Sequence, residues 1–162
     1  MSELQRVRGW ADALLALHLD SSWSFAFDNA KRRAGLCDYT HKRISVSRYL
    51  AARYDDDTNH QTLLHEVAHA LAGPDARHGP RWKAVARDLG YVGGVTHDGE
   101  TAVELAPWVG SCAAGHVVYR HRRPTRPTSC SKCARRFDER FLFTWTRREI
   151  TPAVRLAAIS PR

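Results

Sequence analysis

The segment Asn59-His-Gln-Thr-Leu-Leu-His-Glu-Val-Ala-His-Ala-Leu-Ala-Gly73 contains the pattern H-E-x-x-H, which packing alone explains poorly. An α-helix repeats every 3.6 residues, so His65 and His69 lie on one face and can share one small cation. Glu66 then lies beside them. Two histidines and a glutamate in an apolar helix are costly unless they are paired or bound to a metal. The pattern therefore predicts a metal site on a helix.

Local signals support a helix over this segment. Thr58 with Gln61 is typical of a capping box, and the acidic run 55–57 suits the positive end of the helix dipole. Gly73-Pro74 predicts the end of the helix. The helix should be buried because its other residues are largely apolar, namely Leu63, Leu64, Val67, Ala68, Leu71 and Ala72. A pair of core histidines satisfied by backbone carbonyls is the alternative.

The whole chain is long enough for one domain, or for one domain with a small module. It has 162 residues, of which 43% are hydrophobic. No apolar run approaches the roughly 18 residues of a membrane span, and the start of the chain is too charged for a secretory signal. We therefore expect a cytoplasmic monomer that does not enter a membrane, associated with the nucleoid if the source is bacterial.

Cysteines and charges distinguish the C-terminal third. Cys130 and Cys133 form C-x-x-C, which in a cytosolic chain favours metal or redox chemistry over a disulfide. Residues 106–162 contain twelve Lys or Arg against three Asp or Glu, whereas residues 1–105 contain thirteen against fourteen. The net charge of +8 therefore comes from the C-terminal segment, which predicts a surface for a polyanion, most simply nucleic acid. A basic surface that only aids solubility is the alternative.

Hydrophobic periodicity predicts the remaining elements. Alternating residues predict strands at 23–27, 34–39 and 43–47, and again through Phe141, Phe143 and Trp145. Ile44 and Val46 should face inward, and Cys37 should be a small core residue. Helices are predicted over 3–18, from Ser47 to Arg53, and from Gly79-Pro80 onward. The segment 91–105 is expected to be a loop and the end from Thr151 a loose tail.

A hydrolytic zinc site usually takes three protein ligands and leaves a fourth position for water, so the histidine pair needs one more partner. His78 is favoured because it follows the helix end after a short loop that can fold back. The oxygen ligands Asp75, Glu100 and Glu104 are alternatives. Glu66 is the candidate general base. An oxyanion stabiliser is also expected, and the candidates are Arg77, Tyr91 and His97.

These residues resemble a known family. The string H-E-V-A-H-A-L, followed by His78-Gly-Pro-Arg-Trp-Lys83, resembles the SprT-like zinc metallopeptidase family, which includes Spartan and has H-E-x-x-H and then H-G-P-x-[aromatic]-K. Upstream, Trp23-Ser-Phe-Ala-Phe27, Arg33-Ala-Gly-Leu-Cys37 and Ile44-Ser-Val-Ser47 are similar to the strands of the family. The resemblance covers roughly residues 14–145. It implies zinc-dependent peptide hydrolysis, which in Spartan-type members is directed at proteins on DNA.

A second group of ligands occurs in the basic segment. Cys112-Ala-Ala-Gly-His116 and Cys130-Ser-Lys-Cys133 form two turns that each offer two soft ligands, and four such ligands make a closed structural zinc site. Because the segment has few apolar residues, metal binding would supply much of its stability. His121 competes with His116 as the fourth ligand. SprT-like proteins often end in such a zinc ribbon, many with four cysteines, so His116 departs from that pattern.

The span between the two turns, residues 117–129, is rich in arginine. Its side chains can reach phosphates, and Tyr119, with Phe137 or Trp145, could stack an exposed base. This pattern predicts binding to nucleic acid, DNA above all, without sequence specificity. The predicted contacts are Tyr119, Arg120, Arg122, Arg123 and Arg126.

Together these patterns predict an α+β fold with a zincin-like minimal metallopeptidase domain over residues 1–105, a basic β zinc ribbon over 106–148 and a tail over 149–162. The first domain should contain an N-terminal helix, a small antiparallel sheet, the H-E-x-x-H helix and a following helix. We expect two zinc ions, one catalytic and one structural, in a protease that acts on proteins bound or crosslinked to DNA. The alternative is a non-catalytic, zinc-stabilised protein with a nucleic-acid-binding or regulatory role.

Overall fold

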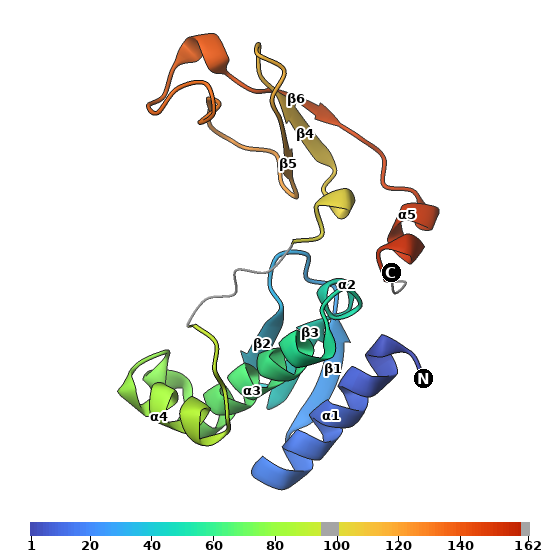
Figure 1. Cartoon of the computed structure of the whole chain (residues 1–162), viewed down its shortest axis with the longest axis vertical. Coiled ribbons are helices and arrows are strands. Elements are labelled where there is room, and N and C mark those ends of the chain that lie inside the picture. Colours follow the sequence, from blue (N-terminus) through green and yellow to red (C-terminus); the bar gives the residue numbers. More distant parts are fainter. Residues whose placement is uncertain (95–100, 160–162) are drawn as a thin grey trace. The chain divides into compact units, whose positions relative to one another are not determined.

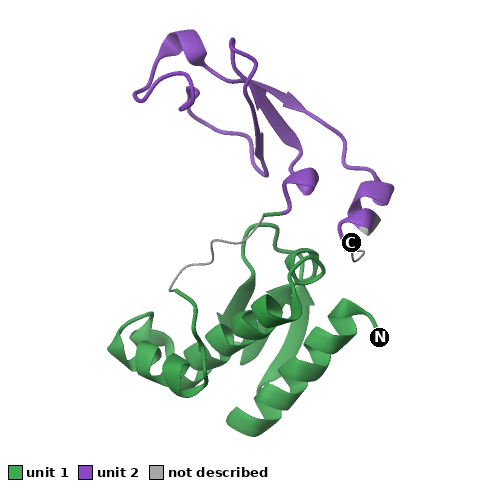
Figure 2. Cartoon of the chain, in the orientation of Figure 1, with its two compact units in different colours: residues 1–101, 159–162 green, residues 102–158 purple. Residues whose placement is uncertain are grey.

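The computed structural model describes residues 1–94 and 101–159, and the chain divides into two compact units (Figure 2). The first comprises Met1–Thr101 with the end of the chain from Ile159, and the second comprises Ala102–Ala158. The first unit contains α1 (Glu3–His18), β1 (Ser24–Asp28), β2 (Gly35–Asp38), β3 (Arg43–Ser47), α2 (Arg48–Ala51), α3 (Asp56–Ala72), the 3-10 helix η1 (Pro74–Ala76) and α4 (Pro80–Asp88). The second contains η2 (Val103–Leu105), β4 (Trp108–Ser111), β5 (Val117–Arg120), η3 (Glu139–Phe141), β6 (Thr144–Arg147) and α5 (Pro152–Ala157).

The first unit is built on a three-stranded sheet of order β1-β3-β2 (Figure 1). β2 runs antiparallel to the central strand β3, but β1 runs parallel to it, so the predicted antiparallel sheet is wrong for this pair. Side chains alternate along a strand whether its neighbour runs parallel or antiparallel, so the sequence pattern did not reveal the parallel pairing of β1. The chain passes from β1 to the far edge of β3, forms β2 there and returns along the centre. This order leaves β2 as an edge strand.

The helices α1 and α3 pack side by side on this sheet, α1 along β1 and α3 along β2 and β3 (Figure 1). Ile44 and Val46 of β3 are buried beneath them, as predicted. The core around these two residues consists of Val7, Ala11 and Leu15 from α1 and Leu63 and Val67 from α3. Because α3 is held by apolar contacts along its length, its polar residues are fixed in position.

The helix ends follow from local hydrogen bonds. α1 covers the predicted range and begins with a capping box between Ser2 and Gln5. For α3 the predicted cap is wrong, because the Asp55 carboxylate accepts the Thr58 N–H at 2.8 Å and the helix therefore begins three residues earlier than Thr58 implied. Gly73 ends this helix with a φ of 85°, a conformation that glycine adopts without strain.

The second unit contains an antiparallel sheet of order β5-β4-β6. Phe141 belongs to η3 and Phe143 precedes β6, so the predicted strand is wrong at both residues and only Trp145 lies in it. The expected loose tail contains the short helix α5. The predicted domain border at Leu105 also differs from the border between the units, which precedes Ala102.

Arg148 accounts for that border. Its guanidinium donates to the carbonyls of Val103, Glu104 and Ala106 at 2.8, 3.0 and 2.9 Å. These bonds tie η2 to the end of β6, more than forty residues later in the sequence, so η2 belongs with the ribbon. Throughout the part of the chain that the structure describes, no helix combines the length and apolar character needed to cross a membrane.

Candidate metal centres

Three histidines converge at the C-terminal half of α3. The helix places His65 and His69 one turn apart, and η1 turns the chain back so that His78, just before α4, meets them. Their Nε2 atoms lie 3.2 Å apart for His65 and His69, 2.9 Å for His69 and His78, and 3.1 Å for His65 and His78. The structure therefore brings together the three predicted ligands.

This triangle of nitrogens fits a zinc ion. Tetrahedral zinc with Zn–N bonds of about 2 Å would hold its nitrogen ligands about 3.3 Å apart. Among the described residues, the group of converging ligand atoms contains His65, His69 and His78 and does not include Asp75. Glu104 belongs to the second unit, and Glu100 lies outside the described residues. Three nitrogens on one side of an ion would leave a coordination position open.

Aromatic rings hold the histidines in place. The Trp82 ring of α4 is buried and lies 4.7, 5.3 and 4.7 Å from the rings of His65, His69 and His78. Burial, together with the neighbouring His78, lowers the pKa of His69 to about 4. His69 is therefore neutral at physiological pH, which is the form that binds a metal.

Of the three oxyanion candidates, Tyr91 lies beside this centre. Its ring is 5.3 Å from that of His65, and its hydroxyl donates to the Gly94 carbonyl at 2.7 Å. Arg77 is an exposed residue with a φ of 43°, and His97 lies outside the described residues. A further hydroxyl that sequence reasoning missed is that of Tyr39, which donates to the His69 carbonyl at 3.0 Å and steadies α3 at this ligand.

Glu66 is buried between α3 and the edge strand β2, with 7% of its surface exposed. Its carboxylate accepts the backbone N–H of Cys37 and is attracted by Arg33. Burial outweighs both effects and raises the pKa of Glu66 to about 8. A carboxyl in such a site is poised to hold or release a proton near neutral pH, as a general base requires.

Gly35 is the residue that makes room for Glu66, and sequence reasoning missed it. A Cβ atom at this position would meet the Oε1, Cγ and Cδ atoms of Glu66 at 2.6, 2.7 and 2.9 Å. Contacts this short force the carboxylate to move. A glycine within a predicted strand was the available signal, because such a residue often marks the close approach of another group.

The pH dependence of unfolding tests the environment of Glu66. In the metal-free chain its pKa is about 8 when folded, against 4.5 as the ordinary value, so the folded state keeps a proton that the unfolded state has lost. This contribution to stability is fully present below pH 4.5 and is lost as pH rises to 8. With the metal removed by a chelator, the free energy of unfolding in urea should therefore fall as pH rises over this range. The fall should be larger for the wild type than for Glu66→Gln by several kcal/mol. Parallel stability curves would contradict the burial of an ionisable Glu66.

The second centre lies in the ribbon, where the two predicted turns meet. The Cys112 and Cys133 sulfurs are 3.8 Å apart, and His116 Nδ1 lies 3.6, 3.5 and 3.2 Å from the sulfurs of Cys112, Cys130 and Cys133. Tetrahedral zinc would set S···S at about 3.8 Å and S···N at about 3.6 Å. The four atoms therefore fit a closed zinc site, with His116 using Nδ1.

The competing residues lie elsewhere. His121 is not in the group of four converging ligands. Cys37 belongs to neither group, and burial raises the pKa of its thiol to about 12, so the thiol stays protonated. Cys37 was predicted to be a small core residue, but it lies on β2 with its side chain only partly buried, at the border of the core.

The predicted nucleic-acid contacts do not all lie on one surface. Tyr119 and Arg120 are adjacent on β5 and therefore point to opposite faces of the ribbon sheet. The Arg148 guanidinium lies over the Tyr119 ring, 4.7 Å from its centroid, although 40% of Tyr119 stays exposed, and Arg123 lies over the Trp108 ring at 5.4 Å. Arg122 and Arg126 are exposed in the loop after β5. Trp145 is on the face of Arg120, and Phe137 is exposed outside the strands.

A helix that carries two histidines and a buried glutamate, completed by a third histidine, defines a zincin-like metal centre in an α+β unit. The family model of the SprT-like family matches residues 9–103, more than half of the chain, and the chain belongs to this family, as the sequence predicted. The family is generally associated with metallopeptidase function. The match ends before the ribbon. A search of curated proteins and a search of solved structures each gave no match.

Proposed function

We propose that the protein is a zinc-dependent endopeptidase with its active centre at His65, His69 and His78. The observation that carries this proposal is Glu66, a buried carboxyl group one residue from a ligand of a three-nitrogen centre. A purely structural metal site has no use for such a group, whose burial is costly. A hydrolytic centre needs one as a base.

The residues of the chain can perform the steps of hydrolysis. The three histidines would hold a zinc ion that, when bound, polarises a peptide carbonyl and lowers the pKa of water to about 7. Glu66 would accept a proton from the attacking water and pass it to the leaving amine. Beside a bound cation the ionised form of Glu66 is favoured, so its pKa would lie below the value for the metal-free centre. Gly35 and the Cys37 N–H would keep the carboxylate in place.

The substrates we propose are proteins bound or crosslinked to DNA, which makes repair of such crosslinks the biological role. The charge distribution supports this proposal, because the excess of Lys and Arg lies in the ribbon and residues 1–105 are nearly neutral. A basic ribbon would hold the peptidase on nucleic acid while the first unit cleaves what is attached there.

The test is cleavage of a basic DNA-binding protein by the zinc-loaded chain, with and without DNA. We expect cleavage that DNA accelerates, that a chelator abolishes and that added zinc restores. An equal rate of cleavage with and without DNA would indicate a peptidase for ordinary soluble proteins. Zinc and DNA binding without any cleavage would indicate the non-catalytic alternative.

Metal analysis should find two zinc ions per chain, one in each unit. His78→Asn should lose one ion and leave the ribbon intact, whereas the double change Cys130→Ser/Cys133→Ser should lose the other and unfold the ribbon. Cys37→Ser is the matched control and should keep both ions, because Cys37 is in neither centre. A single ion in the wild type would refute one of the two centres.

A further inference from the structure

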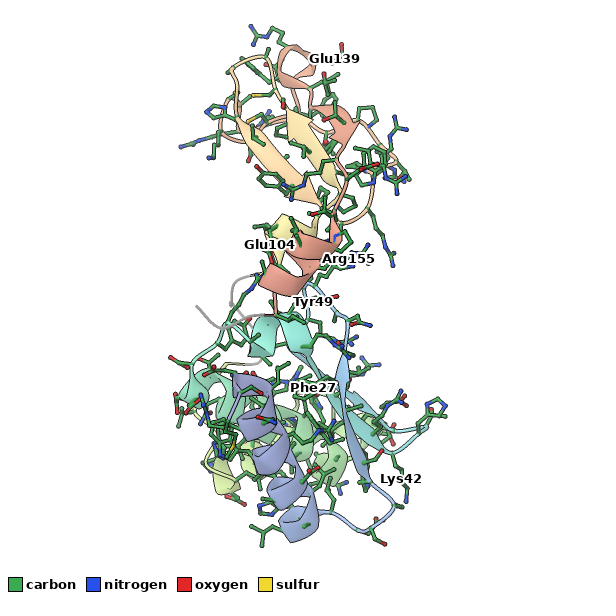
Figure 3. All side chains as sticks on the ribbon, turned by 90° about the vertical axis from the view of Figure 1, so that its right-hand side faces the viewer. Phe27, Lys42, Tyr49, Glu104, Glu139 and Arg155 are labelled. Atoms are coloured by element: carbon green, nitrogen blue, oxygen red, sulfur yellow. The ribbon has the colours of Figure 1, made fainter. Side chains whose placement is uncertain are left out.

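A groove lies between α1 and β1, outside both metal centres. Its volume is about 560 Å³, within the range of about 300–1,000 Å³ that is typical of ligand-binding pockets. In Figure 3 α1 lies at the front of the first unit and β1 runs beside it, with Lys42 close to the beginning of that strand. The apolar part of the lining consists of Leu15, Ala16, Leu19, Trp23 and Phe25.

The walls of the groove are fixed by the core of the first unit. Leu15 of α1 is buried against Ile44 and Val67, and Trp23 and Phe25 pack on the same cluster. Because a close-packed core leaves these side chains little freedom, the groove cannot close by moving them inward. The groove is therefore a fixed feature of the surface.

The free edge of β1 runs along this groove. Among the described residues β1 has a neighbouring strand on one side only, because it is an outer strand in the order β1-β3-β2. The Ser24 N–H donates to the Lys42 carbonyl on the β3 side at 3.0 Å. Alternate residues of a strand direct their backbone groups the opposite way, so the N–H and C=O groups of Phe25 and Phe27 point to the free edge. An extended peptide can pair with such an edge and place its side chains in a pocket beside it.

The charge of the lining is negative. Asp12 and Asp20 are exposed, and they are the charged residues that line the groove. Arg8, one turn before Asp12 on α1, lies instead over the Phe25 ring, 5.3 Å from its centroid. Among the described residues no cation forms an ion pair with Asp12, and Lys42 Nζ is 4.0 Å from the Asp20 carboxylate. The groove is therefore complementary to a ligand that combines apolar and positively charged side chains.

We propose that this groove binds an extended segment of the protein substrate that is rich in lysine or arginine, away from the bond that is cleaved. Apolar side chains of the segment fill the space beside Trp23 and Phe25, and its cationic side chains pair with Asp12 and Asp20. Proteins that bind DNA carry such segments, because they neutralise phosphates with Lys and Arg. This inference rests on the proposed function and names the surface by which the peptidase selects basic proteins.

The groove and the first metal centre belong to the same unit. The Trp23 ring lies 6.5 Å from the ring of Tyr39, and the Tyr39 hydroxyl donates to the carbonyl of the ligand His69. A protein with a basic segment outside the cleaved sequence can therefore occupy both sites, whereas a short peptide occupies the metal centre alone.

The first test measures binding without cleavage, in the full, zinc-loaded chain that carries Glu66→Gln. The probe is a fluorescent peptide in which lysine alternates with leucine, and fluorescence anisotropy gives its Kd. Asp12→Asn/Asp20→Asn should weaken binding about fivefold, because two ion pairs at the surface are lost. A peptide with glutamate in place of lysine should not bind, and equal affinity for the two peptides would overturn the proposal.

Asp57→Asn/Asp88→Asn is the matched control for the loss of charge. It removes two carboxylates from exposed positions of α3 and α4 and should change the Kd of the lysine peptide little. Equal effects of the two double variants would show that net charge alone attracts the peptide, and the groove would then have no part in binding.

A second comparison tests the shape of the groove. Ala16→Arg places a long cationic side chain in the groove and should weaken binding of the lysine peptide at least about tenfold. Leu17→Arg is the control, because Leu17 is the next residue of α1, is 76% exposed and does not line the groove. Arginine is a good helix former, so both variants should fold, which thermal unfolding verifies. Equal weakening by both would contradict a peptide bound in the groove.

Cleavage separates this inference from the proposed function. In the chain with Glu66 intact and without DNA, Ala16→Arg should raise KM for a basic DNA-binding protein about tenfold, whereas Leu17→Arg should leave it unchanged. The ratio of kcat/KM for this protein to kcat/KM for a short fluorogenic peptide should fall by the same factor in Ala16→Arg. An unchanged ratio would overturn the role of the groove in substrate binding. If the wild type cleaves neither substrate, the proposed function fails, and the Kd values measured with Glu66→Gln still decide whether the groove holds a basic segment.

Discussion

Glu66→Gln should fold, bind both zinc ions and cleave peptides about 10² to 10⁴ times more slowly than the wild type. Glutamine has the shape of glutamate and can fill the space beside Gly35, but its amide cannot accept a proton from water. In the metal-free chain the Glu66 pKa of about 8 means that a neutral group already occupies this position at pH 7, so the substitution should not destabilise the fold. The measurement is kcat/KM on a fluorogenic peptide, with zinc content determined on the same samples.

Glu139→Gln provides the control for this prediction. It makes the same chemical change at an exposed residue of η3 in the ribbon and should leave peptide cleavage unchanged. Full activity in Glu66→Gln would refute the assignment of the base, and with it the peptidase proposal. Loss of zinc from the first centre would instead show that Glu66 supports the metal site and would leave its role in proton transfer unproved.

Gly35→Ala should destabilise the first unit and slow peptide cleavage. The backbone of β2 accepts alanine, but the new methyl group would overlap the Glu66 side chain, and overpacking of this kind costs about 1–3 kcal/mol. The carboxylate must move to relieve the overlap, and a displacement of about 1 Å at a catalytic group can lower the rate about 100-fold. Unfolding by urea and kcat on the fluorogenic peptide measure the two effects.

A double-mutant cycle separates the contact with Glu66 from a general effect on the strand. In the Glu66→Ala background the side chain that Gly35 accommodates is gone, so Gly35→Ala should cost little stability there. Gly9→Ala is the matched control, because a Cβ atom at Gly9 in α1 meets nothing within 4 Å and helix propensity favours alanine. An equal cost of Gly35→Ala in both backgrounds would place its effect outside the contact with Glu66.

Much of the first unit could be predicted because its signals are local. The spacing of His65 and His69, the apolar stripe of α1 and the glycine that ends α3 each depend on residues a few positions apart. His78 also belongs to this group, since only a short turn separates it from the helix. Family membership rests on the same residues. The ribbon ligands could be predicted for a similar reason, because each turn presents its own pair.

Other features arise from contacts between residues distant in the sequence. The parallel pairing of β1, the tie between Arg148 and η2, and the closeness of Gly35 to Glu66 depend on which segments meet. Strand periodicity carries no direction, and a glycine does not show what approaches it. Strand β5 shows the same limit. Alternation along the strand places Tyr119 and Arg120 on opposite faces, but only the register of the sheet shows that Arg120 shares its face with Trp108 and Arg147.

The sequence by itself therefore determined the chemistry available to this protein: two sets of potential metal ligands, a candidate base and a basic C-terminal segment. Only the tertiary structure decided how that chemistry is presented, by burying Glu66 against an edge strand and by gathering arginines and tryptophans on one face of the ribbon. The reason is physical. Ligand type and helical spacing are properties of neighbouring residues, whereas burial and the composition of a face depend on which strands pair and in which register.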